Sequence, residues 1–218
     1  MNLLLSLLFA PPIRVLFIGN SHTAANNLPL MVQSLFPAGT LKAEHRSGAF
    51  LNDIAKNPEV IKTIREGHYN FVILQGAMLS SSHKYKYTQE GAIKLATEAA
   101  ASGARVLLFA EWSRKGIRES DYILGIYGGI SKQTKAKIVP ICTAFDNAIV
   151  ANKDLDLWSS DGNHASVQGS FLAALTIYRA LEGTRPPTWK PAHVSTSLCK
   201  VLWNASQVTN TASKNHPG

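Results

Sequence analysis

The sequence lacks the features of a fibrous, disordered or membrane-spanning protein. No run of apolar residues reaches the ~20 that a helix needs to cross a bilayer, and only 17% of its 218 residues are charged. The hydrophobic fraction of 45% is enough to fill a core, and the charge is too sparse for a disordered chain. A single core can grow to roughly 250–300 residues before it splits. We therefore expect one globular domain, of the size of an ordinary α/β domain, with no membrane span.

Cysteine is almost absent, with Cys142 and Cys199 as the two examples. Neither lies in a spacing typical of metal ligands, which argues against a zinc site. They could pair in an oxidising compartment, but two cysteines far apart in sequence carry no geometric information. The sequence leaves their pairing open.

Acidic residues are outnumbered: 14 Asp and Glu against 22 Lys and Arg give a formal net charge of +8. The basic residues are scattered except at His83-Lys84-Tyr85-Lys86-Tyr87, where they alternate with aromatic residues. Such a segment can bind single-stranded nucleic acid, but charge alone says little about function. We interpret it as a solvated loop and expect no nucleic-acid partner, although the net charge favours an anionic surface or substrate.

The two ends of the chain differ from its middle. Residues 1–10 form an apolar run that resembles the hydrophobic part of an export signal, but it lacks a basic start and is followed by Pro11 and Pro12. A shortened export signal or a buried extension fits this pattern, and the first slightly favours a secreted or periplasmic location over a cytoplasmic one. We expect the main domain at 11–190 and a C-terminal extension, rich in Ser, Thr and Asn, at 191–218.

Short β-branched or apolar runs alternate with helical stretches. The runs are 14–18, 41–45, 71–75, 105–110 and 137–141. The third and fourth are apolar on both faces, as in parallel strands that helices cover on both sides. This alternation predicts an α/β fold with right-handed crossovers and a doubly wound sheet.

The segments between these runs suit helices. The segment from Thr88 to Ser102 is rich in Ala, Glu and Lys, and Gly103 follows as a stop. The segment from Ser166 to Leu181 has apolar residues at i, i+3 and i+4 spacings. Further candidates are 28–36, 58–65, 120–135 and a short helix near 198–205.

Ligands of an open parallel sheet bind beyond the carboxyl ends of its strands. The first strand is followed by Gly19-Asn20-Ser21-His22-Thr23. Gly19 permits a tight turn, and Ser21 would begin the crossover with its N–H free to hold an oxyanion and its hydroxyl placed to attack an acyl carbon. A serine here is also a common helix cap, so alone it is a weak signal.

A nucleophilic serine needs a base, and the base needs an acid that orients it. Asp161 and His164 are separated by two residues, Gly162 and Asn163, and lie just before the last long helix. Such a turn can fold the carboxylate onto the imidazole Nδ1 and leave Nε2 directed at Ser21. The alternative is a helix-capping motif with an exposed His164. The two motifs together favour catalysis, because each supplies what the other lacks.

These motifs resemble those of the SGNH, or GDSL, hydrolase superfamily. The segment Phe17-Ile18-Gly19-Asn20-Ser21-His22-Thr23 is similar to its first block, with Asn20 in place of the usual Asp, and Asp161-Gly162-Asn163-His164 is similar to its last. Gly169 follows where the family often has a glycine. The match runs from about residue 14 to residue 183. It implies a flavodoxin-like three-layer α/β/α fold, with a five-stranded parallel sheet in the order 2-1-3-4-5.

The middle blocks of the family are matched more loosely. Arg46-Ser47-Gly48-Ala49 resembles the second block, whose glycine donates a backbone N–H to the oxyanion. The third block is Gly-x-Asn-Asp, but here the third strand ends in Ile73-Leu74-Gln75-Gly76-Ala77. The Gln75 carboxamide is the same donor on a longer stem, so it could replace the Asn. Alternatively, Gln75 hydrogen-bonds the adjacent strand end.

Glu111 and Trp112 follow the fourth strand and should face the same crevice. We expect Trp112 to form a pocket wall. Glu111 is either a hydrogen-bonding group behind the site or a structural acid, with the second slightly favoured. Together with Asn20 they make up the predicted substrate pocket.

The resemblance implies a serine ester hydrolase that acts through an acyl-enzyme. Ser21 would be the nucleophile, His164 its base and Asp161 the acid that orients the base. The oxyanion donors would be the N–H groups of Ser21 and Gly48 and the amide of Gln75. The substrate would be a small-molecule or glycan ester, with acetylated carbohydrate as one option, and the reaction needs no metal or organic cofactor.

Two alternatives stay open. The first is a flavodoxin-like module that binds an anion in the Gly19–Thr23 turn, which would leave Asp161 and His164 without a role. The second is a catalytically weak relative that binds glycan through Trp112 and the loop at 84–87.

Overall fold

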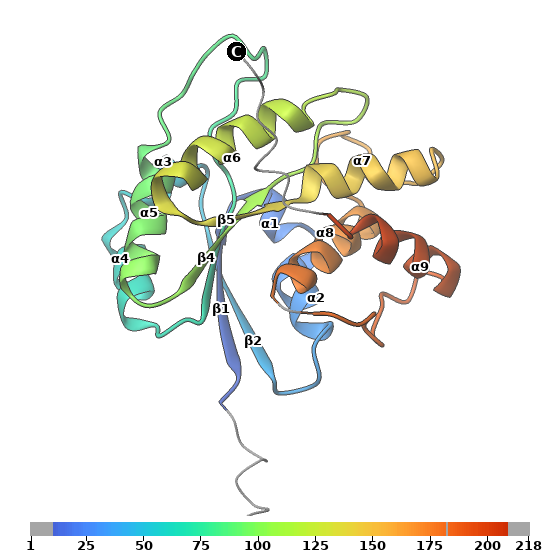
Figure 1. Cartoon of the computed structure of the whole chain (residues 1–218), viewed down its shortest axis with the longest axis horizontal. Coiled ribbons are helices and arrows are strands. Elements are labelled where there is room, and N and C mark those ends of the chain that lie inside the picture. The colour runs from blue at the N-terminus through green and yellow to red at the C-terminus, as the bar shows by residue number, and fades with distance from the viewer. Residues whose placement is uncertain (1–10, 182, 209–218) are drawn as a thin grey trace, which may run out of the picture.

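The computed structural model describes residues 11–181 and 183–208. The export-like segment expected at residues 1–10, and the end of the C-terminal extension at 209–218, lie outside the described residues. Within the described part, strands and helices alternate along the chain, as the sequence predicts (Figure 1). None of the helices described there has the length and apolar character that crossing a membrane requires.

The strands form a parallel sheet. They are β1 (Ile13–Gly19), β2 (Leu41–Ser47), β3 (Phe71–Leu74), β4 (Arg105–Ala110) and β5 (Lys137–Pro140). Their order is β2-β1-β3-β4-β5, and each neighbouring pair is parallel. This confirms the predicted five-stranded sheet and its order.

Successive side chains of each strand point to opposite faces of the sheet, and each face has its own apolar core. In β1, Val15 and Phe17 belong to one core, whereas Leu16 and Ile18 belong to the other. All four side chains are fully buried. Burial on both faces explains why the strands appear in the sequence as continuous apolar runs.

Helices cover both faces of the sheet, which gives the predicted three layers (Figure 1). One layer contains α3 (Leu51–Ile54), α4 (Pro58–Glu66), α5 (Glu90–Ala101) and α6 (Ser120–Thr134). The other contains α2 (Leu28–Ser34), α7 (Ile141–Ala151), α8 (Val167–Ala180) and α9 (Thr196–Ala205). Helices α2, α4, α5, α6, α8 and α9 correspond to predicted segments.

The sequence does not predict α7, because β5 passes into this helix without a loop. Pro140 is both the last residue of the strand and the residue that precedes the helix. No Ser, Thr, Asp or Asn marks the start of α7, so the usual sign of a helix N-terminus is missing. The apolar run at 137–141 therefore resembles a strand throughout.

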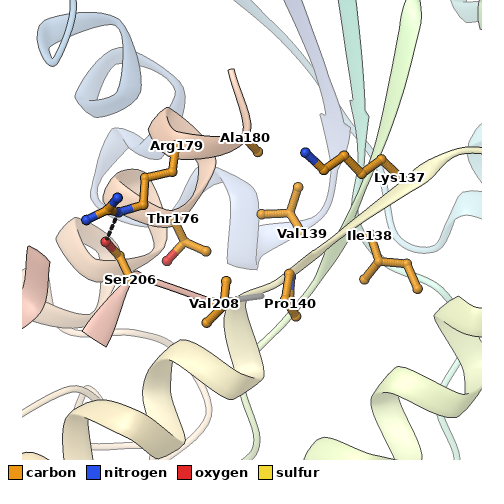
Figure 2. A pocket seen from close by; sticks show the side chains of 9 residues that line it. All are labelled: Lys137, Ile138, Val139, Pro140, Thr176, Arg179, Ala180, Ser206 and Val208. Atoms are coloured by element: carbon orange, nitrogen blue, oxygen red, sulfur yellow. Dashed lines mark hydrogen bonds between the residues drawn. The ribbon is translucent and has the colours of Figure 1, made fainter. Parts of the chain in front are cut away.

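Helix α9, which lies in the predicted C-terminal extension, packs against α7 and α8. Leu202 and Ala205 join the core that α7 and α8 share. Arg179 of α8 fixes the end of α9, because its Nε donates to Ser206 Oγ at 2.9 Å and its guanidinium lies over the Trp203 ring. Figure 2 shows the Arg179–Ser206 contact beside a cavity of about 140 Å³, which β5 and α8 line.

The two cysteines do not pair. Cys142, in α7, is buried, and Cys199, in α9, is half-buried, and both are free. Burial raises the pKa of the Cys142 thiol to about 12. Cys142 therefore packs as a small apolar group and has no thiolate character at neutral pH.

Candidate active site

The turn after β1 carries the predicted nucleophile. β1 ends at Gly19, and Ser21 is the first residue of the one-turn helix α1 (Ser21–Ala24). Asn20 caps this helix, because its Oδ1 accepts the N–H of His22 at 3.0 Å and its carbonyl accepts the N–H of Thr23 at 3.0 Å. Ser21 is exposed at the helix start, where a backbone N–H has no intrahelical acceptor.

Gln75, which directly follows β3, holds this turn by hydrogen bonds from the core. Gln75 Oε1 accepts the N–H of Asn20 at 3.0 Å and the hydroxyl of Thr23 at 2.8 Å. A Cβ on Gly19 would lie 2.7 Å from the same oxygen and still closer to Thr23. The approach of Gln75 to the turn is therefore possible because residue 19 is glycine.

The second motif lies in the loop between α7 and α8. Trp158 and Ala165 form an antiparallel bridge, so the residues between them close into a tight turn. Gly162 has a φ of 66°, in the left-handed region that favours glycine. The N–H of Gly162 donates to the carbonyl of Ser159 at 3.0 Å, which tightens the turn further.

Asp161 is held inside this turn by its own neighbours. Its Oδ1 accepts the hydroxyl of Ser159 at 2.7 Å and the backbone N–H groups of Asn163 at 2.8 Å and His164 at 2.9 Å. The hydrogen bond with the His164 ring, followed by these three, holds the pKa of the Asp161 carboxyl well below its usual range. Asp161 is therefore ionised at neutral pH, although it is exposed.

The two motifs meet at Ser21. His164 Nδ1 lies 2.6 Å from Asp161 Oδ2, and His164 Nε2 lies 2.8 Å from Ser21 Oγ. Because Nδ1 faces an ionised carboxylate, it carries the ring proton, and Nε2 is left to accept from the Ser21 hydroxyl. Residues 143 positions apart in the chain thus form one line of hydroxyl, imidazole and carboxylate. This is the arrangement of a nucleophile, its base and an orienting acid.

Asn26 ties the two motifs together, and the sequence analysis does not single it out. It lies in the 3-10 turn Ala25–Asn27 with a φ of 52°, a conformation that Asn tolerates better than most residues. Its Nδ2 donates to the carbonyl of Ala165 at 3.0 Å and to Ser170 Oγ at 2.8 Å. The available signal was the Asn26-Asn27 pair just before a helix, which is typical of a turn.

His22 is a second residue that the sequence analysis passes over. Its ring stacks on Trp112 with centroids 5.0 Å apart, and its centroid lies 5.2 Å from that of His164. Burial, and then the neighbouring His164, lower the pKa of His22 to about 4. His22 is therefore neutral at pH 7 and adds no positive charge beside His164.

Two of the predicted pocket residues are buried instead. Trp112 is 2% exposed and Glu111 is 7% exposed. Trp112 Nε1 donates to the carbonyl of Asn163 at 2.8 Å, so Trp112 supports the His164 turn from behind. Glu111 accepts the Tyr127 hydroxyl at 2.5 Å inside the core. Of the three residues, Asn20 alone is half-exposed.

Two of the three predicted oxyanion donors are also occupied or buried. The N–H of Gly48 donates to the carbonyl of Gly19 at 3.1 Å, because β2 runs to Ser47 and its pairing with β1 continues past the predicted strand end. Gln75 is 1% exposed, and its Nε2 is a buried atom without a hydrogen-bond partner. The N–H of Ser21 remains where the sequence analysis expects it, at the start of α1.

The basic and aromatic segment at 83–87 is a loop, as expected. Its residues are exposed, and His83 contacts Glu119 through Nε2 and Oε1 at 3.1 Å. Among residues 11–181 and 183–208, no group of three or more His, Cys, Asp or Glu side chains could hold a metal ion.

Neither a protein-family model nor a curated protein sequence matches the chain, but solved structures do. A protein from Slackia heliotrinireducens, provisionally described as an SGNH hydrolase, has a TM-score of 0.63 at 22% identity, over 78% of this chain and 99% of its own. A DUF4886 family protein from Bacteroides uniformis has a TM-score of 0.62 at 17% identity, over 92% of this chain and 98% of its own. An acetyl xylan esterase has a TM-score of 0.57 at 15% identity, over 78% of this chain and 100% of its own.

These structures define the class of fold. The structural neighbours over most of the chain are SGNH or GDSL hydrolases and esterases. The chain therefore has the SGNH hydrolase fold, which the resemblance of its first and last motifs implies. At these identities the likeness extends to the fold alone, and an activity has to be argued from the residues of the site.

Proposed function

We propose that the chain is a serine hydrolase that cleaves carboxylic esters through an acyl-enzyme. The observation that carries the proposal is the pair of hydrogen bonds at His164, 2.8 Å to Ser21 Oγ and 2.6 Å to Asp161 Oδ2. Both distances lie in the range of a nucleophile that an adjacent base activates. Esterases among the proteins with this fold support the same reaction class.

In the first step, His164 Nε2 accepts the Ser21 proton while Oγ forms a bond to the ester carbonyl carbon. The imidazolium is stabilised by Asp161, whose carboxylate stays ionised, and the neutral His22 does not oppose it. His164 then returns the proton to the alcohol oxygen as its bond to the acyl carbon breaks. Water then attacks the acyl carbon while His164 takes one of its protons. His164 returns that proton to Ser21 Oγ as the bond between Oγ and the acyl carbon breaks, which releases the carboxylic acid.

The negative charge that develops on the carbonyl oxygen needs donors. The N–H of Ser21 is one, because the N–H groups of His22, Thr23 and Ala24 already have acceptors in Asn20. Asn20 Nδ2 is the candidate for a second oxyanion donor. Asn20 Oδ1 already accepts the N–H of His22, and the carboxamide nitrogen has no acceptor in the described part of the chain. An oxyanion donor that is fixed before reaction is typically worth ~10²–10³ in turnover.

The substrate class that we propose is a short-acyl ester of a small molecule or a glycan, with acetylated carbohydrate among the candidates. Ser21 is exposed, so a bulky alcohol can reach it from the surface. One protein with this fold is an acetyl xylan esterase. The net charge of +8 favours a substrate that carries negative charge nearby.

The test is labelling with a fluorophosphonate probe, followed by mapping of the labelled peptide and assays with p-nitrophenyl acetate. We expect the label on Ser21, and a loss of kcat of at least ~10³-fold in Ser21→Ala with the thermal midpoint nearly unchanged. Ser160→Ala is the matched control, because Ser160 is an exposed serine of the His164 loop. A label on another residue, or wild-type turnover in Ser21→Ala, would refute the proposal.

A further inference from the structure

A buried carboxylate lies beneath the Ser21 turn without a basic partner. Glu111 directly follows β4 and is 7% exposed. The groups that contact it in the described part of the chain are neutral, namely the Tyr127 hydroxyl, the Gln75 amide and backbone N–H groups. An unpaired carboxylate in a core costs stability. A buried carboxyl group with this cost is easier to understand if its hydrogen bonds serve the site above it.

Tyr127, on α6, connects Glu111 to the turn after β3. Its hydroxyl accepts the N–H of Gly76 at 3.3 Å and the N–H of Ala77 at 3.4 Å. A phenol has a single proton, and these two contacts use its lone pairs, so the hydroxyl must donate to Glu111 Oε2, which lies 2.5 Å away. The turn at Gly76, with a φ of 99°, is therefore fixed to the Glu111 carboxylate.

Gln75 connects Glu111 to the turn after β1. Its Oε1 faces that turn, where it accepts from Asn20 and Thr23, so its Nε2 must point the other way. This nitrogen is buried and makes no well-formed hydrogen bond. Burial raises the pKa of Glu111 to about 7, and the Tyr127 hydroxyl and then the Gln75 amide are close enough to the carboxyl to oppose part of that rise. Glu111 is the acceptor within reach of a donor that is otherwise orphaned.

We propose that Glu111 is a positioning residue for Ser21. One carboxylate holds the turn after β1 through Gln75 and the turn after β3 through Tyr127, and these strands are neighbours in the sheet. The Ser21 hydroxyl and N–H are thereby kept in register with His164. The inference rests on the proposed ester hydrolysis. A displacement of about 1 Å at a reacting atom can cost ~10²-fold in rate.

Glu111→Gln tests the inference directly. The variant keeps the volume of Glu111 and an oxygen for Tyr127, but it sets an NH₂ group against Gln75 Nε2, so one connection must break. We expect both kcat for p-nitrophenyl acetate and the rate of fluorophosphonate labelling to fall 10- to 100-fold. KM should stay within about threefold, because Glu111 does not touch the substrate.

Tyr127→Phe breaks the other connection and should lower kcat in the same way. If the two residues act as a unit, Glu111→Gln combined with Tyr127→Phe should be no slower than the slower single variant. Tyr127→Phe also carries the test by itself if Glu111→Gln fails to fold, and wild-type kcat in Tyr127→Phe would then overturn the inference.

Glu119→Gln is the matched control. Glu119 is also 7% exposed, but it pairs with Arg114 at 2.6 Å and has no contact with the Ser21 turn. We expect a lower thermal midpoint with kcat and labelling within about threefold of wild type. A Glu111→Gln variant at wild-type rates, or an equal loss in Glu119→Gln, would overturn the inference alone. A wild-type chain that is not labelled at Ser21 would overturn the proposed function and this inference with it.

Discussion

The two oxygens of the Asp161 carboxylate have different hydrogen-bond partners. Oδ1 accepts from Ser159 Oγ and from the backbone N–H groups of Asn163 and His164, whereas Oδ2 faces the His164 ring alone. Three donors therefore fix which oxygen can point where. An amide at this position would have to keep its oxygen among these donors and turn its NH₂ toward His164 Nδ1.

Asp161→Asn should therefore lock His164 in the wrong tautomer. Nδ1 would have to present a lone pair to the amide, which puts the ring proton on Nε2, and Ser21 would lose its proton acceptor. We expect kcat to fall by ~10³–10⁴ with KM little changed, as for a comparable change in serine proteases. Steady-state kinetics with p-nitrophenyl acetate measures this. A kcat within tenfold of wild type would mean that another group orients His164.

At the residue scale, the sequence predicts what is local and misses what depends on packing. Ser21, Asp161 and His164 lie in two short motifs that are weak signals singly, because each could also cap a helix, but that together supply a nucleophile, a base and an acid. The environment of Gln75 is different, since its partner Asn20 is 55 residues away along the chain. Whether an amide at a strand end faces solvent or core depends on the neighbouring strand, and no local pattern encodes that.

Among the elements, α8 begins in contact with the loop that carries His164. Ser166 caps this helix, with its Oγ accepting the N–H of Gly169 at 3.2 Å. A Cβ on Gly169 would overlap the carbonyl oxygen of Leu157 and would lie 3.1 Å from the Ala165 side chain. The glycine thus lets the first turn of α8 press against the loop, which gives a physical reason for a glycine at this point of the motif.

Gly169→Ala should lower the free energy of unfolding by about 1–3 kcal/mol, because backbone must move to make room for the methyl group. Gly125→Ala is the matched control on α6, where a Cβ would meet no atom within 4 Å. There the loss of backbone freedom in the unfolded chain should raise stability by about 0.5–1 kcal/mol. Urea denaturation measures both changes, and a shift of the same sign in both variants would contradict this account.

The positions at which strands end determine which backbone N–H groups are free at the site. The strands and most helices follow from hydrophobic patterns, but the two residues by which β2 exceeds its predicted end bring Gly48 next to the strand pairing and give its N–H an acceptor. Strand ends are set by hydrogen bonding to a neighbour, and a composition pattern does not contain that neighbour. The sequence therefore predicts the layer order better than the oxyanion donors.

At the scale of the whole molecule, the site is assembled from two segments far apart in the chain, the turn after β1 and the loop before α8. β1 is an inner strand, and α8 packs on α2, which follows the Ser21 turn. The line from Ser21 to Asp161 thus depends on the complete layer that α2, α7 and α8 form on one face. Nothing local holds Ser21 near His164 before that layer has packed.

His22, which is half-buried within the site, and Glu111, which is buried beneath it, respond to pH in opposite directions. Burial lowers the pKa of His22 from 6.5 to about 4, with His164 and Asp161 as the titratable groups that face it. Burial raises the pKa of Glu111 from 4.5 to about 7, with Tyr127 as its main partner. The stability that neutral His22 contributes is present above pH 6.5 and is lost as the pH falls through 4. The stability that protonated Glu111 contributes is present below pH 4.5 and is lost as the pH rises through 7.

Between about pH 4.5 and 6.5 these two effects should largely cancel, and single variants should separate them. His22→Phe keeps a ring against Trp112 and removes the titration of His22. Between pH 7 and pH 4, the free energy of unfolding should therefore fall by about 3 kcal/mol less in this variant than in wild type. This difference corresponds to the pKa shift of His22. Glu111→Gln should avoid a loss of about 3 kcal/mol between pH 4.5 and pH 8 for the same reason. Urea unfolding at a series of fixed pH values measures both differences. Variants whose stability follows the wild-type pH curve in parallel would show that neither side chain changes its proton affinity on folding.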